Sequence, residues 1–171
     1  MTATIADLPR YADPAAAEAE GYRWVGDNTG EMHWINWSYI NDGRILDPDH
    51  PESLVYRNEG GQRVLVAAMF MLSDADTLET APDVGGKLTQ WHVHGDLCFT
   101  DDPVAARLAG FVSTDEPCGA PLAKRAAMPM IHVWIVPHEC GPFAALAGIG
   151  GGQIAPDEQR LCDRAHGRGL L

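Results

Sequence analysis

The sequence predicts a mainly β, α+β fold: an antiparallel β-barrel or sandwich with a short helix near each end of the chain. Three observations support this prediction. Apolar and β-branched residues alternate with polar ones in several short segments, which is strand periodicity. Turns rich in glycine, proline and asparagine separate these segments. A length of 171 residues suits one domain with a sizeable core, so we expect a single globular unit over residues 1–171.

The first predicted element is a short helix that begins after Asp13 and ends at Gly21. Asp13 is a suitable N-cap, Pro14 occupies the first turn, and glycine commonly follows the last helical residue. Strands are predicted at residues 22–25 and in the aromatic segment 31–40. The sequence Asp-Asn-Thr-Gly at residues 27–30, between these strands, is a turn by composition.

A β-hairpin is predicted next. Residues 53–57 and 64–72 are its strands, and the sequence Asn-Glu-Gly-Gly at residues 58–61 is its turn. The second strand is apolar enough to be central in the sheet. Its nine residues are too few for a membrane-spanning helix, which needs about 20.

The second half of the chain contains two more predicted strands, at residues 90–94 and 130–136. Residues 101–108 are compatible with either a short helix or an irregular loop, and residues 114–129 form a long connection. A glycine-rich loop at residues 148–152 then precedes the C-terminal helix, predicted at residues 156–165.

The two later strands carry the strongest functional signal. In a strand, side chains at positions i and i+2 point to the same face, so His92 and His94 project together while Val93 points away. His132, on the other strand, is the candidate for a third imidazole. Three histidine ligands with open positions for water or substrate are typical of a catalytic metal site. The alternative is that these rings only form structural hydrogen bonds to the backbone or to carboxylates.

All-nitrogen ligation suits one divalent transition metal, iron, copper, zinc or nickel, better than magnesium or calcium. Among these metals we favour iron or copper, with zinc or nickel as alternatives, for the reason given below. Iron or copper would support dioxygen chemistry, whereas zinc would activate a bound water. Three tryptophans lie close in sequence to candidate ligands, which favours an apolar pocket and redox chemistry on a small-molecule substrate. These are Trp34, Trp91 and Trp134.

Two further groups are candidates. His33 is a possible fourth ligand, and Glu31 shares its strand face as a ligand, a partner of a ligand or a base. An exposed edge strand would explain both equally well. His138, at the end of the last strand, is a second candidate for a catalytic role.

Composition excludes some partners. Twelve Lys and Arg against twenty-four Asp and Glu give a formal net charge of −12, which would repel nucleic acid. No segment suggests membrane association, and a homo-oligomer is left open. The N-terminus has no export signal, so we expect a cytoplasmic protein with free thiols. Export with up to two disulfides is the alternative, because the chain has four cysteines.

Residues 86–94 resemble the opening of the first cupin motif, in which a glycine and five further residues precede His-x-His. This resemblance implies a jelly-roll barrel with a three-histidine centre formed by His92, His94 and His132. The chain departs from the cupin pattern after the second histidine, where Leu97, Cys98 and Phe99 stand in place of the usual glutamate.

A second resemblance covers more of the chain. Four segments resemble a family of bacterial proteins without an assigned activity. They are Gly-Tyr from residue 21, Met-His-Trp-Ile-Asn from residue 32, Pro-Glu-Ser-Leu-Val-Tyr from residue 51 and His-Val-Trp from residue 132. This resemblance implies that His33 belongs with the other three histidines.

The sequence therefore predicts a mononuclear metal-dependent enzyme, with an oxidoreductase favoured. The alternatives are a zinc-type hydrolase or lyase and a non-catalytic protein that binds a metal or small ligand, such as a carrier or sensor.

Overall fold

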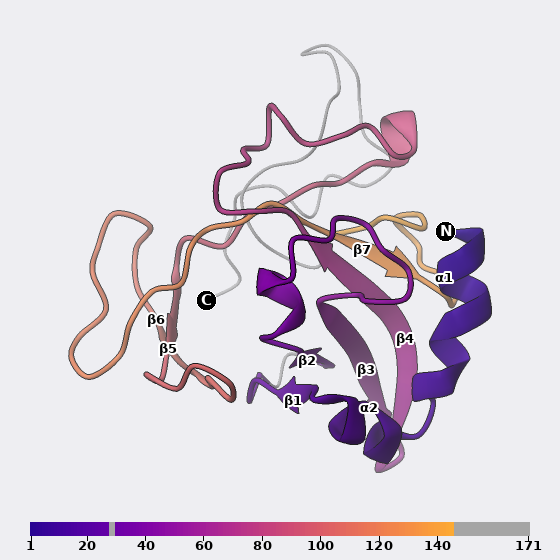
Figure 1. Cartoon of the computed structure of the whole chain (residues 1–171), viewed down its shortest axis with the longest axis horizontal. Coiled ribbons are helices and arrows are strands. Elements are labelled where there is room, and N and C mark those ends of the chain that lie inside the picture. The colour runs from indigo at the N-terminus through magenta and orange to yellow at the C-terminus, as the bar shows by residue number, and fades with distance from the viewer. Residues whose placement is uncertain (28–29, 146–171) are drawn as a thin grey trace.

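The computed structural model describes residues 1–27 and 30–145. In chain order the elements are α1 Thr2–Asp7, the 3-10 helix η1 Leu8–Tyr11, α2 Pro14–Glu20, β1 Arg23–Trp24, β2 Glu31–Ile35, η2 Tyr39–Asn41, β3 Ser53–Glu59, β4 Gln62–Met71, η3 Gly86–Leu88, β5 Leu97–Phe99, β6 Leu108–Phe111 and β7 Met130–Trp134. Five strands form an antiparallel sheet in the order β1-β2-β3-β4-β7, and β5 pairs with β6 (Figure 1). The glycine-rich loop and the C-terminal helix that the sequence predicts lie outside the described residues.

Helix α2 begins and ends where the sequence predicts. The Asp13 carboxylate accepts a hydrogen bond of 2.9 Å from the backbone N–H of Ala15, and Gly21 closes the helix with a φ of 105°. The short helices α1 and η1 precede it. The Tyr56 hydroxyl donates a 2.6 Å hydrogen bond to the Tyr11 carbonyl, which attaches this helical segment to β3.

Strands β3 and β4 form the predicted hairpin. Gly60 and Gly61 have φ values of 61° and 89°, a conformation that favours glycine at both turn positions. Val66 is an extra residue between the partners of Val55 and Tyr56, so the hairpin contains a β-bulge. A bulge bends its strand and increases the local twist.

Strand β2 is shorter than the predicted segment, which extended to residue 40. Asn36 is buried, and its side-chain oxygen accepts a 3.1 Å hydrogen bond from the Ser38 N–H. Its side-chain amide donates to the Glu20 carbonyl at 3.1 Å. These bonds replace strand pairing and turn the chain into η2.

The two faces of the five-stranded sheet are covered by different segments. One face packs against residues of the N-terminal helical segment together with Ala81, Trp91 and Phe143. The opposite face packs against other residues from the second half of the chain. In Figure 1 helix α1 and the β5–β6 pair accordingly lie on different sides of the sheet. Apolar residues of the first face include Leu8, Tyr11, Ala17 and Tyr22; those of the second include Phe99, Ala106, Cys140 and Ala144.

The predicted strand at residues 90–94 is reduced to isolated bridges. His92 pairs with Met130 through two backbone hydrogen bonds of 3.0 and 2.8 Å, which adds this residue to the edge of β7. The two residues before His92 are fixed by hydrogen bonds of their side chains and not by backbone pairing with another strand. Gln90 accepts a hydrogen bond from Ala145 at 2.9 Å, and the Trp91 indole donates to a backbone carbonyl at 2.7 Å.

Residues 101–108 form a turn and the start of β6, and contain no helix. The Asp102 carboxylate accepts hydrogen bonds from the N–H groups of Val104 and Ala105 at 2.9 and 2.8 Å. Asp side chains commonly stabilise turns in this way. Of the two alternatives left open by the sequence, a short helix or an irregular loop, the structure thus shows the loop.

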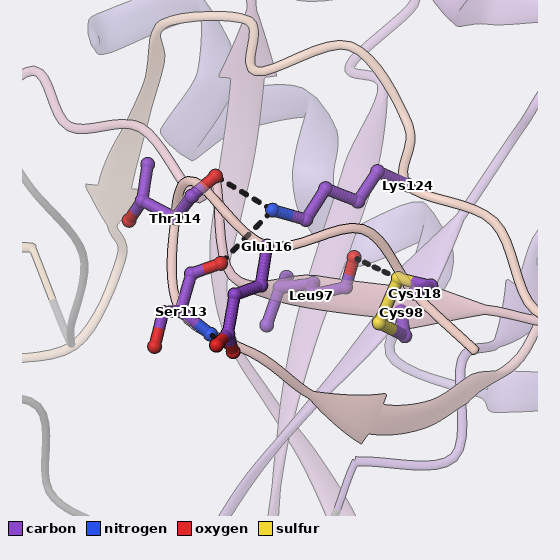
Figure 2. The surroundings of a disulfide bond; sticks show 7 residues. All are labelled: Leu97, Cys98, Ser113, Thr114, Glu116, Cys118 and Lys124. Carbon is purple, nitrogen blue, oxygen red and sulfur yellow. Dashed lines mark hydrogen bonds between the residues drawn. A yellow bond between two sulfur atoms is a disulfide. The ribbon is translucent and has the colours of Figure 1, made fainter.

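A disulfide joins Cys98 on β5 to Cys118 in the long connection before β7 (Figure 2). The Lys124 ammonium donates to the carbonyls of Ser113 and Thr114 at 3.1 and 2.7 Å, which fastens the same connection. The expectation of free thiols is therefore wrong for these two cysteines, because the connection folds back onto β5. The described residues contain no free cysteine.

The mainly antiparallel fold with short N-terminal helices is confirmed. The described strands form two separate sheets and no closed barrel, so the arrangement is consistent with the sandwich alternative. No helix in residues 1–27 and 30–145 is long and apolar enough to cross a bilayer.

Candidate histidine site

His33 and His132 meet at one point in the structure. The Nε2 atoms of the two rings lie 3.2 Å apart. Strands β3 and β4 separate β2 from β7, so in a flat sheet the two backbones would be about 14 Å apart. The sheet must therefore curl toward the face that carries both histidines, and the bulge at Val66 contributes to this curvature.

Asp27 orients His33. Its Oδ2 atom lies 2.6 Å from the His33 Nδ1 atom, and its carboxylate also accepts the backbone N–H of His33. A carboxylate at this position keeps a proton on Nδ1, which leaves the Nε2 of a neutral ring with a lone pair. That lone pair faces the His132 Nε2. Either a proton or a metal ion must lie between the two nitrogens, because two facing lone pairs repel each other.

His92 and His94 lie next to this pair. The rings of His92 and His132 are stacked, with centroids 5.2 Å apart and planes at 11°. The His94 ring meets His92 edge-on at 5.4 Å, and its Nδ1 lies 3.6 Å from the Asp96 carboxylate. The structure thus gathers the four predicted metal-ligand candidates into one group of adjoining rings.

Burial disfavours the charged form of two of these imidazoles, those of His132 and His94. Desolvation, with smaller contributions from neighbouring histidines, lowers the pKa of His132 well below its usual value. Desolvation also lowers the pKa of His94, and Asp96 partly opposes that shift. Neutral imidazole is the form that binds metals, so the protein favours the ligand state of both side chains.

His132 has a second unusual feature. Its Nδ1 atom is fully buried and has no hydrogen-bond partner among the described residues. Such atoms are uncommon in native proteins, and a catalytic role or a bound ion is among the explanations for them. The free-energy cost of one unsatisfied buried group is about 1–3 kcal/mol.

Glu31 and His138 take different positions. The Glu31 carboxylate forms an ion pair with the Arg57 guanidinium at 3.1 Å. Arg57 lies opposite Glu31 in the pairing of β2 with β3. The His138 ring stacks on Trp134 with centroids 4.4 Å apart, and its Nδ1 accepts the Cys140 N–H at 3.1 Å. Burial lowers the pKa of His138. Trp134 lies between His138 and His132, with its ring 4.4 Å from the first and 5.8 Å from the second.

The donors meet a metal's requirements only in part. Metal–nitrogen bonds of about 2.0–2.1 Å at tetrahedral or octahedral angles place two ligand nitrogens about 2.9–3.4 Å apart. The His33 and His132 Nε2 atoms satisfy this condition. Within residues 1–27 and 30–145, however, no three His, Cys, Asp or Glu side chains are arranged as a group that could hold a metal ion.

Gly95 allows the chain to pass close to the connection after His94. A Cβ atom on Gly95 would lie 2.8 Å from the Thr114 Cγ2 atom, which is closer than real contacts. The backbone beside His94 is thus packed against the disulfide-linked connection. This packing limits how the His94 segment can move.

Two surface hollows lie elsewhere. One of about 900 Å³ is lined by residues that include Trp24, Met32 and Arg63. The other, of about 260 Å³, shares Trp24 and Arg63 and adds Arg23 and Arg107. Neither hollow is lined by a histidine.

The sequence interpretation missed Asp27. It lies in a stretch whose composition predicts only a turn, six positions before His33. Its role depends on the pairing of β1 with β2, which brings the end of one strand beside the start of the other. An aspartate that closely precedes a histidine-bearing strand was the only available signal.

No protein-family model matches the chain, and no curated protein or solved structure matches it either. The two resemblances drawn from the sequence therefore remain predictions.

Proposed function

We propose that the chain is a metal-dependent enzyme whose first-row transition metal is held by His33 and His132 through Nε2, with His92 and His94 completing the ligand set. An oxidoreductase acting on a small molecule is the favoured activity. The proposal uses the four histidines predicted from the sequence and adds Asp27 as the residue that orients one of them.

The observation that carries the proposal is the Asp27–His33–His132 arrangement. A carboxylate on the outer nitrogen of a histidine is the usual support for a metal ligand, because it fixes the tautomer and makes the inner nitrogen a better donor. The inner nitrogen of His33 lies at a metal-ligand separation from the inner nitrogen of His132. His33 is paired with Val55 and His132 with Met69, and both of these partners belong to the core on the face that the second half of the chain covers.

Imidazole donors suit iron, copper, zinc or nickel. We favour iron or copper because tryptophans lie close in sequence to the candidate ligands, as expected for redox chemistry in an apolar pocket. Iron or copper would supply dioxygen or electron-transfer chemistry, and zinc would supply an activated water. The protein's own part is to exclude bulk water, since His92 and His132 are 0 % and 1 % exposed. Trp134, 3 % exposed, adds an apolar wall beside His132.

One observation favours a second candidate, a non-catalytic metal carrier or sensor. Neither of the two hollows reaches the histidines, and the His132 ring is almost completely enclosed. A site without an approach for substrate would store or sense a metal and perform no chemistry on other molecules.

Metal analysis of the purified protein tests the shared part of both candidates. After growth in medium supplemented with iron, copper, zinc or nickel, we expect near-stoichiometric metal in the wild-type protein. His33→Ala and His132→Ala should each lose most of it. His50→Ala is the matched control, because His50 contacts Arg44 and Tyr39 away from the cluster and should retain the metal.

Loss of structure in the alanine variants would confuse this result, so titration of the wild-type protein with Co²⁺ provides a second measurement. Ligand-field bands typical of nitrogen ligation are expected, and X-ray absorption should show an open position for substrate. No metal binding in either experiment would refute the proposal. Metal binding with a closed coordination shell would favour the carrier or sensor.

We also infer that the protein works in an oxidising compartment. Stable disulfides are rare in the cytoplasm, and Cys98 and Cys118 form one. This inference favours the export alternative over the cytoplasmic location that the sequence suggested. Alkylation of the native protein without reductant should leave both cysteines unmodified.

A further inference from the structure

Three arginines surround the hollow of about 260 Å³, although the whole chain contains only twelve basic residues. They come from separate places: Arg23 on β1, Arg63 on β4, and Arg107 immediately before β6. We call this hollow the arginine hollow. Its walls include Glu18, Arg23, Trp24, Trp34, Arg63 and Arg107.

Two of the guanidinium groups lie on tryptophan rings. The Arg63 Cζ atom lies 5.2 Å from the centroid of the Trp34 ring, and the Arg107 Cζ atom lies 5.2 Å from the centroid of the Trp24 ring. A guanidinium near an indole is stabilised by cation–π attraction. The aromatic rings support the cations without using their N–H groups, so these donors remain available for a planar acceptor.

The positive charges of these three arginines are not balanced by carboxylates of neighbouring described residues. In the described part of the chain, no carboxylate lies within ion-pair distance of Arg23, Arg63 or Arg107, whereas Arg10, Arg44 and Arg57 all have such partners. Arg23 donates to two backbone carbonyls at 2.7 Å. Glu18 is the one acidic side chain on the wall of the arginine hollow, so the wall carries a net positive charge in a strongly acidic protein.

The position of Arg107 is fixed by the backbone around it. The Leu108 N–H donates to the Val25 carbonyl at 2.6 Å, which attaches the β6 segment to the chain after β1. Gly26 has a φ of 90°, and a Cβ atom there would lie 3.1 Å from an Arg107 guanidinium nitrogen. Glycine thus leaves the space through which Arg107 reaches Trp24.

Trp34 adds an unused donor. Its indole N–H is buried and has no hydrogen-bond acceptor among the described residues. Trp24, on the same wall, donates its indole N–H to Asp27 at 3.0 Å.

We propose that the arginine hollow binds a small organic carboxylate. Guanidinium groups recognise carboxylates through two parallel N–H···O hydrogen bonds, which favours a planar acceptor over a spherical ion. Trp24, the partly buried tryptophan of the wall, supplies apolar contact for the remainder of such a ligand. The adjoining hollow of about 900 Å³ shares Trp24 and Arg63 and gives the ligand room to extend.

This site is distinct from the histidine cluster but is connected to it through one side chain. Asp27 accepts the Trp24 indole N–H and also contacts the His33 ring. A ligand that moves Trp24 would therefore change the support of His33. The carboxylate proposal does not depend on this connection or on a metal.

Titration calorimetry with benzoate at low ionic strength tests the proposal, with benzamide as the neutral analogue and inorganic phosphate as the non-planar anion. We expect benzoate to bind and benzamide not to bind. Arg63→Gln and Arg107→Gln should each weaken benzoate binding at least about tenfold, since hydrogen bonds to charged groups are worth about 1.5–3 kcal/mol. Arg63→Lys should recover only part of the affinity.

Arg10→Gln is the matched control. Arg10 also lies over an aromatic ring, that of Tyr11, and its replacement changes the net charge by the same amount. It should bind benzoate as the wild-type protein does. Equal loss in the Arg10 variant, binding of phosphate but not benzoate, or no benzoate binding would each overturn the proposal.

Nuclear magnetic resonance of the wild-type protein keeps the test independent of variant folding. Benzoate should shift the indole N–H signals of Trp24 and Trp34. The signal of Trp91, whose indole is buried and bonded to the Pro82 carbonyl, should not move. Shifts confined to other tryptophans would place the ligand elsewhere and refute the assignment.

Discussion

The Nε2 atoms of His33 and His132 lie 3.2 Å apart, although 99 positions separate the two residues in the chain. The contact joins β2 to β7 across the concave side of a curled sheet. It is supported from behind by Asp27, whose carboxylate lies 2.6 Å from His33 Nδ1. These three residues form the part of the candidate site that the structure defines most fully.

Replacing Asp27 by Asn should weaken metal binding without removing the histidines. The variant keeps a side chain of similar shape but loses the charge that makes His33 a better donor, so we expect metal affinity to fall about 10–100-fold. Competition with a chromogenic chelator measures this change.

Asp96→Asn is the control for that prediction. Asp96 lies 3.6 Å from His94 and is more exposed than Asp27. Its replacement should therefore lower the metal affinity several-fold less than the Asp27 replacement does. Similar losses in both variants would mean that a general change in charge, and no specific support of His33, sets the affinity.

Glu52 should make stability depend on pH. Burial raises the pKa of its carboxyl group to about 7, although the backbone N–H of Met71 opposes the shift. In the unfolded chain the group titrates near about 4.3. Between these values the folded state holds more protons, so its contribution to stability is complete at low pH and is lost as pH rises through about 7.

Urea unfolding of the wild-type protein and of Glu52→Gln at pH 4.5 and pH 8 tests this. The difference between their free energies of unfolding should change by on the order of 3 kcal/mol, with the glutamine variant gaining at the higher pH. Glu59→Gln, an exposed residue at the end of β3, should show no such change. A constant difference for Glu52→Gln would contradict the raised pKa.

The disulfide should contribute measurably to stability. Cys98 and Cys118 are 20 positions apart, and closing a loop of this length stabilises the folded state by about 3 kcal/mol in the chain-entropy description. We expect the Cys98→Ala/Cys118→Ala double variant to unfold at correspondingly lower urea concentration. Unchanged stability would show that the connection before β7 is held by its other contacts, such as those of Lys124.

Gly95→Ala should destabilise the segment beside His94. The added methyl group would meet Thr114 Cγ2 at 2.8 Å, and overpacking of this kind costs about 1–3 kcal/mol. Thr114→Ser removes that methyl group, so it should restore most of the loss in the double variant. Thermal unfolding of the four proteins gives the coupling energy, and an absent rescue would show that the clash is not the cause.

Local patterns in the sequence were sufficient for several elements. The N-cap at Asp13, the stop at Gly21 and the paired glycines of the β3–β4 hairpin depend on neighbouring residues, and the structure confirms these predictions. Predictions from local patterns were wrong where side-chain hydrogen bonds compete with strand pairing. Asn36 ends β2 early, and the anchored residues around His92 leave only bridges where a strand was expected.

The sequence by itself determined the chemistry available to this protein: an antiparallel β-rich domain carrying histidines in its strand segments. Only the tertiary structure decided which groups meet. The contact of His33 with His132, the support from Asp27 and the three arginines of the arginine hollow all depend on sheet order, curvature and loop packing. These are set by contacts between residues far apart in the chain, and strand periodicity carries no information about such contacts.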